Sequence, residues 1–423
     1  MIETRTLASG LRIVVEPLPH THSVSVGCFV GVGAAHESSS LAGIAHLIEH
    51  MLFKGSEGYA TPKKLSDAIE GIGGLLDAYT SFESTVYYAK VADLHFERAV
   101  AVLADMLIRP RLFAADLEKE RRVIIEELRQ TEDTPSDLIH QLLDTHMWGD
   151  QPLGRDIAGS AETVMSIGHD ALVESWRSYY TQANTVITVA GNVAADAAII
   201  AIADAFAAMP PGAPMPYLPS TPPRPGPTVV LAKDDSEQVN FCLGFPGVAL
   251  SDPARRALLV FDTIVGGGAS SRLFQEIREE RGLAYTIGSY SHEHHDAGKW
   301  TIYGSVDPAQ LTACITTIMT ELRSVREHGV TEAELAQVRE QVKGGILLSL
   351  EDTWSVASRN GSHMLRYGHV IPLAQVVAEV ESVALAEVGA AAQRVLTPEG
   401  MHLAAIGPFK KADERRLREL LVL

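Results

Sequence analysis

The stretch SVSVGCFVGVGAA, residues 23–35, has a counterpart in QVNFCLGFPGVAL, residues 238–250, and this repetition decides the fold class. Both stretches alternate apolar and small residues as strands do, and their alignment places Cys28 opposite Cys242. Two more pairs repeat in the same order: DLEKERRVIIEELRQTEDT (116–134) with ELAQVREQVKGGILLSLEDT (334–353), and TVITVAGNV (185–193) with GMHLAAIGP (400–408). Three matches in one order predict a duplicated domain.

A segment rich in proline and glycine separates the two copies. AAMPPGAPMPYLPSTPPRPGP, residues 207–227, cannot hold a helix or a central strand, because proline lacks the backbone donor. We therefore expect a first domain over residues 1–206, a linker over 207–227 and a homologous second domain over 228–423. Strands and helices come in runs, which predicts an α+β fold with a mainly antiparallel sheet packed with helices in each domain.

Composition and charge narrow the class of protein. The 423 residues are 46% hydrophobic and 21% charged, as in soluble globular proteins. The formal net charge of −18 at pH 7 argues against nucleic-acid binding and favours a neutral or basic partner. An acidic surface also serves simply to keep a protein soluble, and composition does not separate the two explanations.

Neither a membrane nor an oxidising compartment is indicated. No apolar run reaches the length of a membrane span, and the N-terminus lacks the pattern of a signal peptide, so a cytoplasmic location is expected. Cys28, Cys242 and Cys314 are odd in number and far apart. They are expected to be small core residues, not disulfides or ligands of a cysteine-rich zinc site.

The apolar segment GIAHLIEHMLFKG, residues 43–55, carries three ionisable side chains: His46, Glu49 and His50. On a helix the two histidines lie one turn apart on the same face, and Glu49 lies on its flank. Two such imidazoles can hold a zinc ion, and a neighbouring carboxylate can reach a water on it. The order His-x-x-Glu-His is the inverzincin motif. The alternative is a pair of buried, hydrogen-bonded core histidines.

Zinc needs a third protein ligand, and KERRVIIEELRQ, residues 119–130, offers three glutamates. Glu120 and Glu127 are two helical turns apart and share a face, whereas Glu126 points about 100° away and is expected to face solvent.

The duplication provides an internal test of the metal site. Carrying the Cys28–Cys242 alignment forward places HLIEH on VFDTI, residues 260–264, and the later alignment places Glu127 on Ile346. Apolar residues then stand opposite each proposed ligand. Core packing does not require two histidines and a glutamate there, which favours the metal site over core histidines.

These motifs resemble the pitrilysin/insulinase family of zinc peptidases, and the length and two-domain build resemble its mitochondrial-processing-peptidase branch and bacterial relatives. The family's spacing, counted from His50, lands on Glu127. The resemblance implies that His46, His50 and Glu127 bind one Zn²⁺ per chain, that Glu49 is the general base, and that Glu120 supports the ligands.

The resemblance extends to IREERGLAY, residues 277–285, which contains Arg278 and Tyr285. It implies that this cation and phenol hold the scissile carbonyl and its developing oxyanion. Without the resemblance they would be an ordinary helix-surface arginine and a half-buried tyrosine.

A substrate-binding strand is expected at DAYTS, residues 77–81, where a peptide would add to the sheet edge. The residues expected to contact it are Asp77, Ala78, Tyr79 and Thr80. The family usually has Asn at the first of these positions, and an ionised Asp77 accepts hydrogen bonds but cannot donate them. Together with the net charge, Asp77 favours basic peptides.

The predicted function is that of a zinc-dependent endopeptidase for peptides or unfolded segments. The resemblance implies a homodimer enclosing a chamber, in which Arg278 and Tyr285 serve the zinc of the partner chain. The alternatives are a noncatalytic structural subunit and one half of a heterodimeric processing peptidase. The presence of zinc ligands and the Arg/Tyr pair on one chain favours the homodimer.

Overall fold

The computed structural model describes residues 2–410 and 412–423, which pack as two compact units. Unit 1 comprises Met1–Leu128, Asp156–Leu218 and Ile346–Ile371, and unit 2 comprises Arg129–Arg155, Pro219–Gly345 and Pro372–Leu423. Each unit thus contains one segment from the other half of the chain. The units differ in this respect from the sequence halves 1–206 and 228–423.

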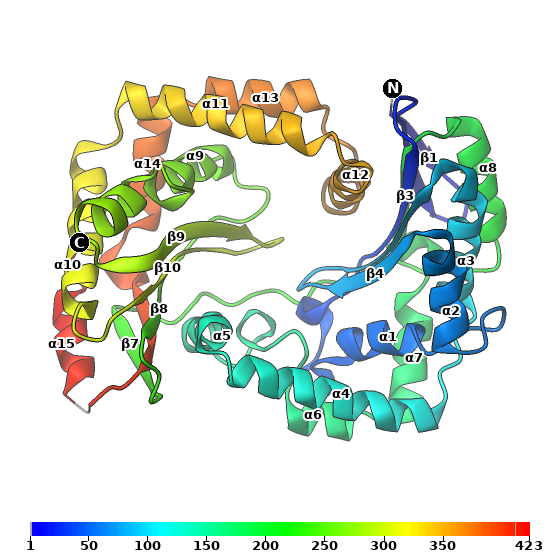
Figure 1. Cartoon of the computed structure of the whole chain (residues 1–423), viewed down its shortest axis with the longest axis horizontal. Coiled ribbons are helices and arrows are strands. Elements are labelled where there is room, and N and C mark those ends of the chain that lie inside the picture. Colours follow the sequence, from blue (N-terminus) through cyan, green and yellow to red (C-terminus); the bar gives the residue numbers. More distant parts are fainter. Residues whose placement is uncertain (1, 411) are drawn as a thin grey trace. The chain divides into compact units, whose positions relative to one another are not determined.

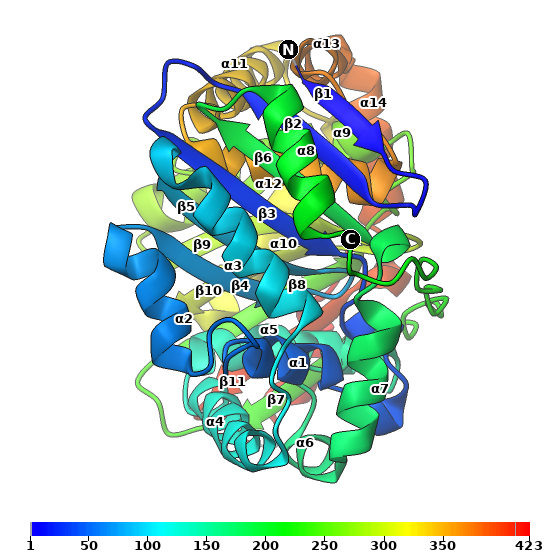
Figure 2. The ribbon, with the colours of Figure 1, turned by 90° about the vertical axis from the view of Figure 1, so that its right-hand side faces the viewer.

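Unit 1 is built on a sheet (Figure 1) whose six strands have the order β1-β2-β6-β3-β5-β4, which can be followed in Figure 2. The strands are β1 (Glu3–Thr6), β2 (Arg12–Pro17), β3 (Ser23–Val30), β4 (Leu75–Thr80), β5 (Thr85–Ala92) and β6 (Thr185–Gly191). All neighbours are antiparallel except β2 and β6. The expected β4–β5 hairpin is present, and β4 is an edge strand.

Unit 2 repeats this topology in a five-stranded sheet of order β7-β11-β8-β10-β9. Its strands are β7 (Thr228–Lys233), β8 (Val239–Pro246), β9 (Ala284–Glu293), β10 (Gly298–Val306) and β11 (His402–Gly407). The single parallel pair, β7 with β11, occupies the place of β2 with β6. Apart from β1, which has no counterpart in the second sheet, the two sheets share their strand order and pattern of directions, which supports the duplication and confirms the α+β class.

Helices cover both faces of the sheet in unit 1. The helices of unit 1 are α1 (Ile44–Leu52), α2 (Pro62–Ile69), α3 (Phe96–Ile108), α4 (Ala114–Glu132, which continues into unit 2), α6 (Ala161–Ser166), α7 (His169–Tyr179), α8 (Ala195–Ala205) and α12 (Thr353–Tyr367). Helices α3 and α8 lie across one face (Figure 2), and α12 packs on the other face against β3 and β6. The helix α12 comes from the second half of the sequence.

Unit 2 has the reciprocal arrangement. Its helices are α5 (Pro135–Trp148), α9 (Arg255–Gly266), a π-helix (Phe274–Glu280), α10 (Leu311–His328), α11 (Glu332–Ser349, which continues into unit 1), α13 (Leu373–Ser382), α14 (Leu385–Val395) and α15 (Asp413–Leu420). Helix α5, from the first half of the sequence, packs on β8 and β11. Each sheet therefore takes one covering helix from the other half of the chain.

The two sheets show that the alignment of Cys28 with Cys242 is wrong by one residue. Cys28 faces the main core of unit 1. Cys242 faces the opposite side of its sheet, under α5, while its neighbours Phe241 and Leu243 face the main core. Strand side chains alternate between faces, so a slip of one residue turns every side chain to the wrong face.

The remaining expectations concern the linker, the cysteines and membranes. Residues 210–227 contain neither helix nor strand. All three cysteines are buried and unpaired, as expected. Within residues 2–410 and 412–423, no helix is both long and apolar enough to cross a membrane.

Candidate metal centre

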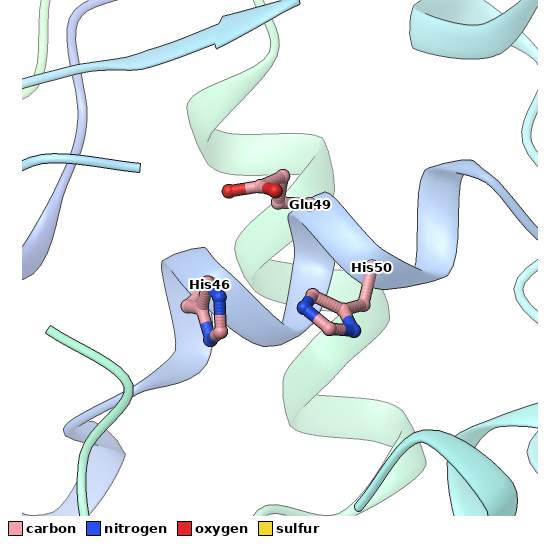
Figure 3. A group of neighbouring side chains, drawn as sticks. All are labelled: His46, Glu49 and His50. Atoms are coloured by element: carbon pink, nitrogen blue, oxygen red, sulfur yellow. The ribbon is translucent and has the colours of Figure 1, made fainter. Parts of the chain in front are cut away.

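Helix α1 carries the two imidazoles of the motif on one face, with ring centroids 4.6 Å apart (Figure 3). Its apolar residues, including Leu47 and Met51, are buried in the core of unit 1 and hold the helix in place. The buried Glu37 carboxylate accepts hydrogen bonds from the backbone amides of Gly43 and Ala45, at 2.7 and 2.8 Å. This acid caps the helix where free N–H groups and the positive end of the dipole favour an anion.

Two carboxylates on α4 approach the histidines, as the spacing predicts. Oε2 of Glu127 lies 3.5 Å from Nε2 of His50 and 4.0 Å from Nε2 of His46. Oε2 of Glu120 lies 3.3 Å from Nδ1 of His50, and its Oε1 is 2.7 Å from Nζ of Lys54. Glu126, the third glutamate of this segment, was expected to face solvent, and its exposure confirms this prediction.

Glu49 is buried on the same helix, with a carboxylate oxygen within 4.8 Å of a ring nitrogen of each histidine. The hydroxyl of Thr80, at the end of β4, donates a 2.5 Å hydrogen bond to Oε2 of Glu49. Two carboxylates thus compete for the role of third ligand. Only Oε2 of Glu127 has ion-pair contacts with Nε2 of both imidazoles, whereas one oxygen of Glu49 is occupied by Thr80.

The electrostatic environment differs among the four groups. Burial, with a smaller effect of His50, lowers the pKa of His46 to about 4, so this imidazole is neutral at pH 7. Burial raises the pKa of Glu49, and the Thr80 hydrogen bond opposes that rise. Burial would lower the pKa of His50, but the Glu120 hydrogen bond and the nearby carboxylates raise it overall. The pKa of Glu120 is lowered because its bonds to His50 and Lys54 outweigh its burial.

The residues fit a zinc ion. Ligand atoms about 2.05 Å from a tetrahedral zinc are about 3.3 Å from one another. The distance from Glu127 to Nε2 of His50, 3.5 Å, is close to this value, and the distance to Nε2 of His46, 4.0 Å, is about 0.7 Å longer. Nε2 of His46 faces Glu127, and Nδ1 on the other side of the ring, which is buried without a hydrogen-bond partner among the described residues, is not the atom proposed to bind the metal. In the described part of the chain, His46, Glu49 and His50 form the one cluster of at least three side chains able to hold a metal ion.

The expected substrate-binding residues lie on edge strand β4, in two sets. Thr80 points toward Glu49. Asp77 accepts a 3.3 Å hydrogen bond from the hydroxyl of Tyr88, which stacks on Trp354 of α12, so Asp77 lies on the α12 side. Asp77 and Tyr79 are exposed, while Ala78 and Thr80 are partly buried. The strand therefore presents alternate side chains to the motif helix and to α12.

Arg278 and Tyr285 meet in unit 2, at the π-helix and the start of β9. Nη1 of Arg278 donates a 2.8 Å hydrogen bond to the backbone carbonyl of Tyr285, and the guanidinium lies 4.5 Å from the ring centroid. Tyr285 is 75% exposed. The structural alternative of a half-buried tyrosine is therefore wrong, and the phenol is available to solvent.

Unit 2 contains a copy of the motif helix without the histidines. The burial pattern of α9 repeats that of α1 position by position and places Leu259 and Thr263 opposite His46 and His50. The sequence alignment, which placed the motif opposite residues 260–264, is therefore one residue out. The error is the one already found in the alignment of Cys28 with Cys242.

One carboxylate of the motif persists in the copy. Asp262 of α9 stands opposite Glu49 and is buried like it. Its Oδ1 accepts hydrogen bonds from Ser289, at 2.6 Å, and from Nε1 of Trp300, at 2.7 Å. The Ser289 bond parallels the bond from Thr80 to Glu49. The expectation of apolar residues concerned the proposed ligands: in the corrected register it holds at Leu259, opposite His46, and is wrong at Thr263, opposite His50, which is polar.

Helix α11 is the counterpart of α4. Arg121 of α4 donates to the carbonyl of Ile167, and Arg339 of α11 donates to the carbonyl of Val383. This register places Val338 opposite Glu120 and Gly345 opposite Glu127, so Ile346 is one residue beyond the true counterpart of Glu127. The conclusion from the duplication holds, because both positions lack a ligand.

Sequence reasoning missed two partners of the site. Lys54 lies four residues after His50 on the same side of the chain, and this spacing could have suggested its contact with Glu120. The bond from Thr80 to Glu49 joins residues 31 positions apart, and no local pattern indicates it.

Known proteins are similar to this chain in sequence over most of its length. Residues 12–161 match the model of the insulinase family (peptidase family M16), and residues 166–342 match that of the peptidase M16 inactive domain. The uncharacterized zinc protease YmxG of Bacillus subtilis is 37% identical, over 96% of this chain and 98% of the relative. An uncharacterized zinc protease of Streptomyces coelicolor is 36% identical, over 99% and 92%.

Solved structures share the fold. A protease from Helicobacter pylori matches with a TM-score of 0.90 at 20% identity, over 96% of this chain and 99% of the other. A chain of complex III2 from Candida albicans matches with a TM-score of 0.83 at 19% identity, over 100% of both chains. The family models and the close relatives, together with the His-x-x-Glu-His cluster, show that this chain belongs to the insulinase family, peptidase family M16, as a zinc protease.

Proposed function

We propose that the chain is an endopeptidase for peptides and unfolded segments, with one Zn²⁺ per chain bound by His46, His50 and Glu127. The observation that carries this proposal is the approach of one Glu127 oxygen to Nε2 of both imidazoles. Glu120 supports the site by accepting from Nδ1 of His50, which fixes the tautomer that leaves Nε2 for the metal.

Glu49 is the general base in this proposal. When bound, zinc supplies a Lewis acid that polarises the scissile carbonyl and lowers the pKa of water. Glu49 takes the proton from the attacking water and passes it to the leaving amine. Burial raises its pKa, which makes it a better proton acceptor, and the Thr80 hydroxyl holds Oε2 so that Oε1 is left for the proton.

The test is metal content combined with activity on an unstructured peptide. Stoichiometric zinc is expected in the purified protein, and His50→Ala should lose most of it. Glu49→Gln should keep zinc but lose activity by roughly 10³-fold. Glu126→Gln, on the same helix as the third ligand but exposed, is the matched control and should change neither property. Full zinc content in His50→Ala would refute the ligand assignment.

The substrate would bind as an added strand on β4. This strand is the edge of its sheet, and two of its side chains, Asp77 and Tyr79, are exposed. Main-chain hydrogen bonds would align the peptide, with Ala78 and Thr80 facing it on the side of Glu49. Asp77 would contribute an acceptor only.

A preference for basic peptides is part of the proposal. The net charge of −18 and the exposed carboxylate of Asp77 on the edge strand support it. Paired peptides that differ only in Lys/Arg versus Asp/Glu content should differ in kcat/KM, and more strongly at low salt. Equal kcat/KM for the basic and acidic peptides at every ionic strength would contradict the preference, and the negative net charge would then serve solubility alone.

The assembly we propose is a homodimer that encloses a chamber, with Arg278 and Tyr285 of each chain holding the oxyanion at the zinc of the other. The support is the presence of both functional groups on one chain. Mixing an inactive Glu49→Gln chain with an inactive Tyr285→Phe chain tests this. Completion in trans creates one intact site per mixed dimer and restores up to half the activity. No recovery after verified subunit exchange would refute it.

A further inference from the structure

Helix α12 is fastened to the sheet of unit 1 beside the edge strand. Its N-cap, Asp352, forms an ion pair with Lys90 of β5. The next residue, Thr353, is buried and its hydroxyl is 2.9 Å from that of Ser25 on β3. Gly27 of β3 makes room for the helix, because a Cβ there would lie 2.9 Å from the ring of Trp354. These contacts fix the first turn of α12 over β3 and β5.

From this turn, α12 contacts the residues that support β4. The ring of Trp354 stacks on that of Tyr88, with centroids 3.8 Å apart and planes 10° apart. The hydroxyl of Tyr88 donates to Asp77 of β4 at 3.3 Å. The exposed Asp77, at the centre of the edge strand, is thus connected to α12 through Tyr88.

An edge strand needs such support if it is to bind a peptide. β4 has ladder bonds on one side only, to β5, so its backbone is held less firmly than that of a central strand. A peptide that adds to a mobile strand must also order that strand, which weakens binding, whereas a preordered strand avoids this loss. Thr80 depends on the same ordering, because its hydroxyl reaches Glu49 from the end of β4.

We infer that Trp354 is a positioning residue that preorders the edge strand for peptide binding, acting through Tyr88 and its hydrogen bond to Asp77. This inference rests on the proposed strand-addition mode of substrate binding. A helix from the second half of the sequence, α12, would thus help to form the substrate-binding edge of the sheet in unit 1. Trp354 itself touches neither the peptide backbone nor the metal ligands.

The test compares two variants with a control on the same helix. Trp354→Leu removes the stack on Tyr88, and Tyr88→Phe keeps the stack but removes the bond to Asp77. Leu365→Ala is the control, because Leu365 packs from α12 against the small core cluster of Phe29. Hydrogen exchange of the β4 amides and peptide binding are measured on the full chain with each change.

The first readout is hydrogen exchange across residues 75–80. Trp354→Leu and Tyr88→Phe should speed exchange there by roughly tenfold, and Leu365→Ala should not. The conservative Trp354→Phe, which keeps a ring over Tyr88, should restore protection. Unchanged exchange in both variants, or equal acceleration in the control, would overturn the positioning role.

The second readout is the affinity of a fluorescein-labelled, unstructured, lysine-containing peptide for the zinc-loaded chain in a Glu49→Gln background. The two variants should raise Kd by roughly three- to tenfold, and in the active chain should raise KM while kcat stays within about twofold. Unchanged Kd despite faster exchange would overturn the role in binding. Absence of peptide binding in every chain, with β4 loosened as expected, would instead refute the proposed function.

Discussion

Asp144→Asn is expected to lower the free energy of unfolding of unit 2 by about 3 kcal/mol, because it leaves a buried ammonium without its counter-ion. Asp144 of α5 pairs with Lys299 of β10, and the two side chains are 15% and 6% exposed. Burial raises the pKa of Asp144 even though Lys299 opposes the rise. The loss of hydration therefore raises the pKa of Asp144 by more than the positive charge of Lys299 lowers it. In a site that excludes water to this extent, water cannot readily replace the carboxylate as the partner of Lys299.

The magnitude lies at the lower end of the range for broken buried pairs, which is about 3–5 kcal/mol. The asparagine oxygen can still accept from Lys299, and the ring of Tyr290 lies 5.8 Å from Nζ. For a unit of about 200 residues, a loss of about 3 kcal/mol corresponds to a fall in Tm of about 9 °C. Urea titration followed by tryptophan fluorescence suits the measurement, since Trp300 is fully buried in unit 2.

Two comparisons separate this mechanism from a generic loss of charge. Asp67→Asn breaks the pair between Lys63 and Asp67, whose side chains are 81% and 58% exposed, and should cost less than about 0.5 kcal/mol. Asp144→Leu combined with Lys299→Met removes both charges and should stay within about 1 kcal/mol of the parent. A double variant as unstable as the single one, or a single variant as stable as the exposed control, would refute the reasoning.

Three further predictions concern separate parts of the chain. Hydrogen bonds from Arg272 lower the pKa of Glu334 to about 2. The ion pair therefore stabilises the folded state fully at pH values above the ordinary pKa of a glutamate, and this contribution is lost as the pH falls toward 2. Glu334→Gln should therefore cost about 1 kcal/mol in urea titrations at pH 7 and nothing near pH 2; equal stability at pH 7 would contradict this. Gly344→Ala should stabilise α11 by about 1 kcal/mol, because an added Cβ meets no atom within 4 Å, and a lower Tm would show that the glycine is needed. Chelation of zinc should abolish activity but leave the far-UV circular dichroism unchanged, because the large core of unit 1 does not depend on one ion, and loss of helical signal would contradict this.

Local patterns were sufficient where the answer depends on one element. The four-residue spacing of His46 and His50 placed both imidazoles on one face of α1. The seven-residue spacing of Glu120 and Glu127 placed both carboxylates on the face of α4 that meets them. Helical periodicity is a property of the backbone, so these placements did not require knowledge of the rest of the molecule.

The exact alignment of the two repeated domains, in contrast, could not be predicted from local sequence patterns. A match around Cys28 and Cys242 identified the right strands, but it was one residue out. Similar residues occupy neighbouring positions in both copies, and only burial in the folded sheet reveals which face each one occupies. The corrected register changed one chemical conclusion, because it brought Asp262 opposite Glu49.

By itself the sequence determined that this chain is a duplicated α+β protein with a histidine pair and two carboxylates on two helices. The tertiary structure alone decided that α5 and α12 each pack in the unit built mainly from the other half of the chain, that Thr80 bonds to Glu49, and that Trp354 supports the edge strand. The physical reason is the range of the interactions. Periodicity and capping act within a few residues, whereas these contacts join segments far apart in the sequence, and their choice depends on shape and burial that exist only after folding.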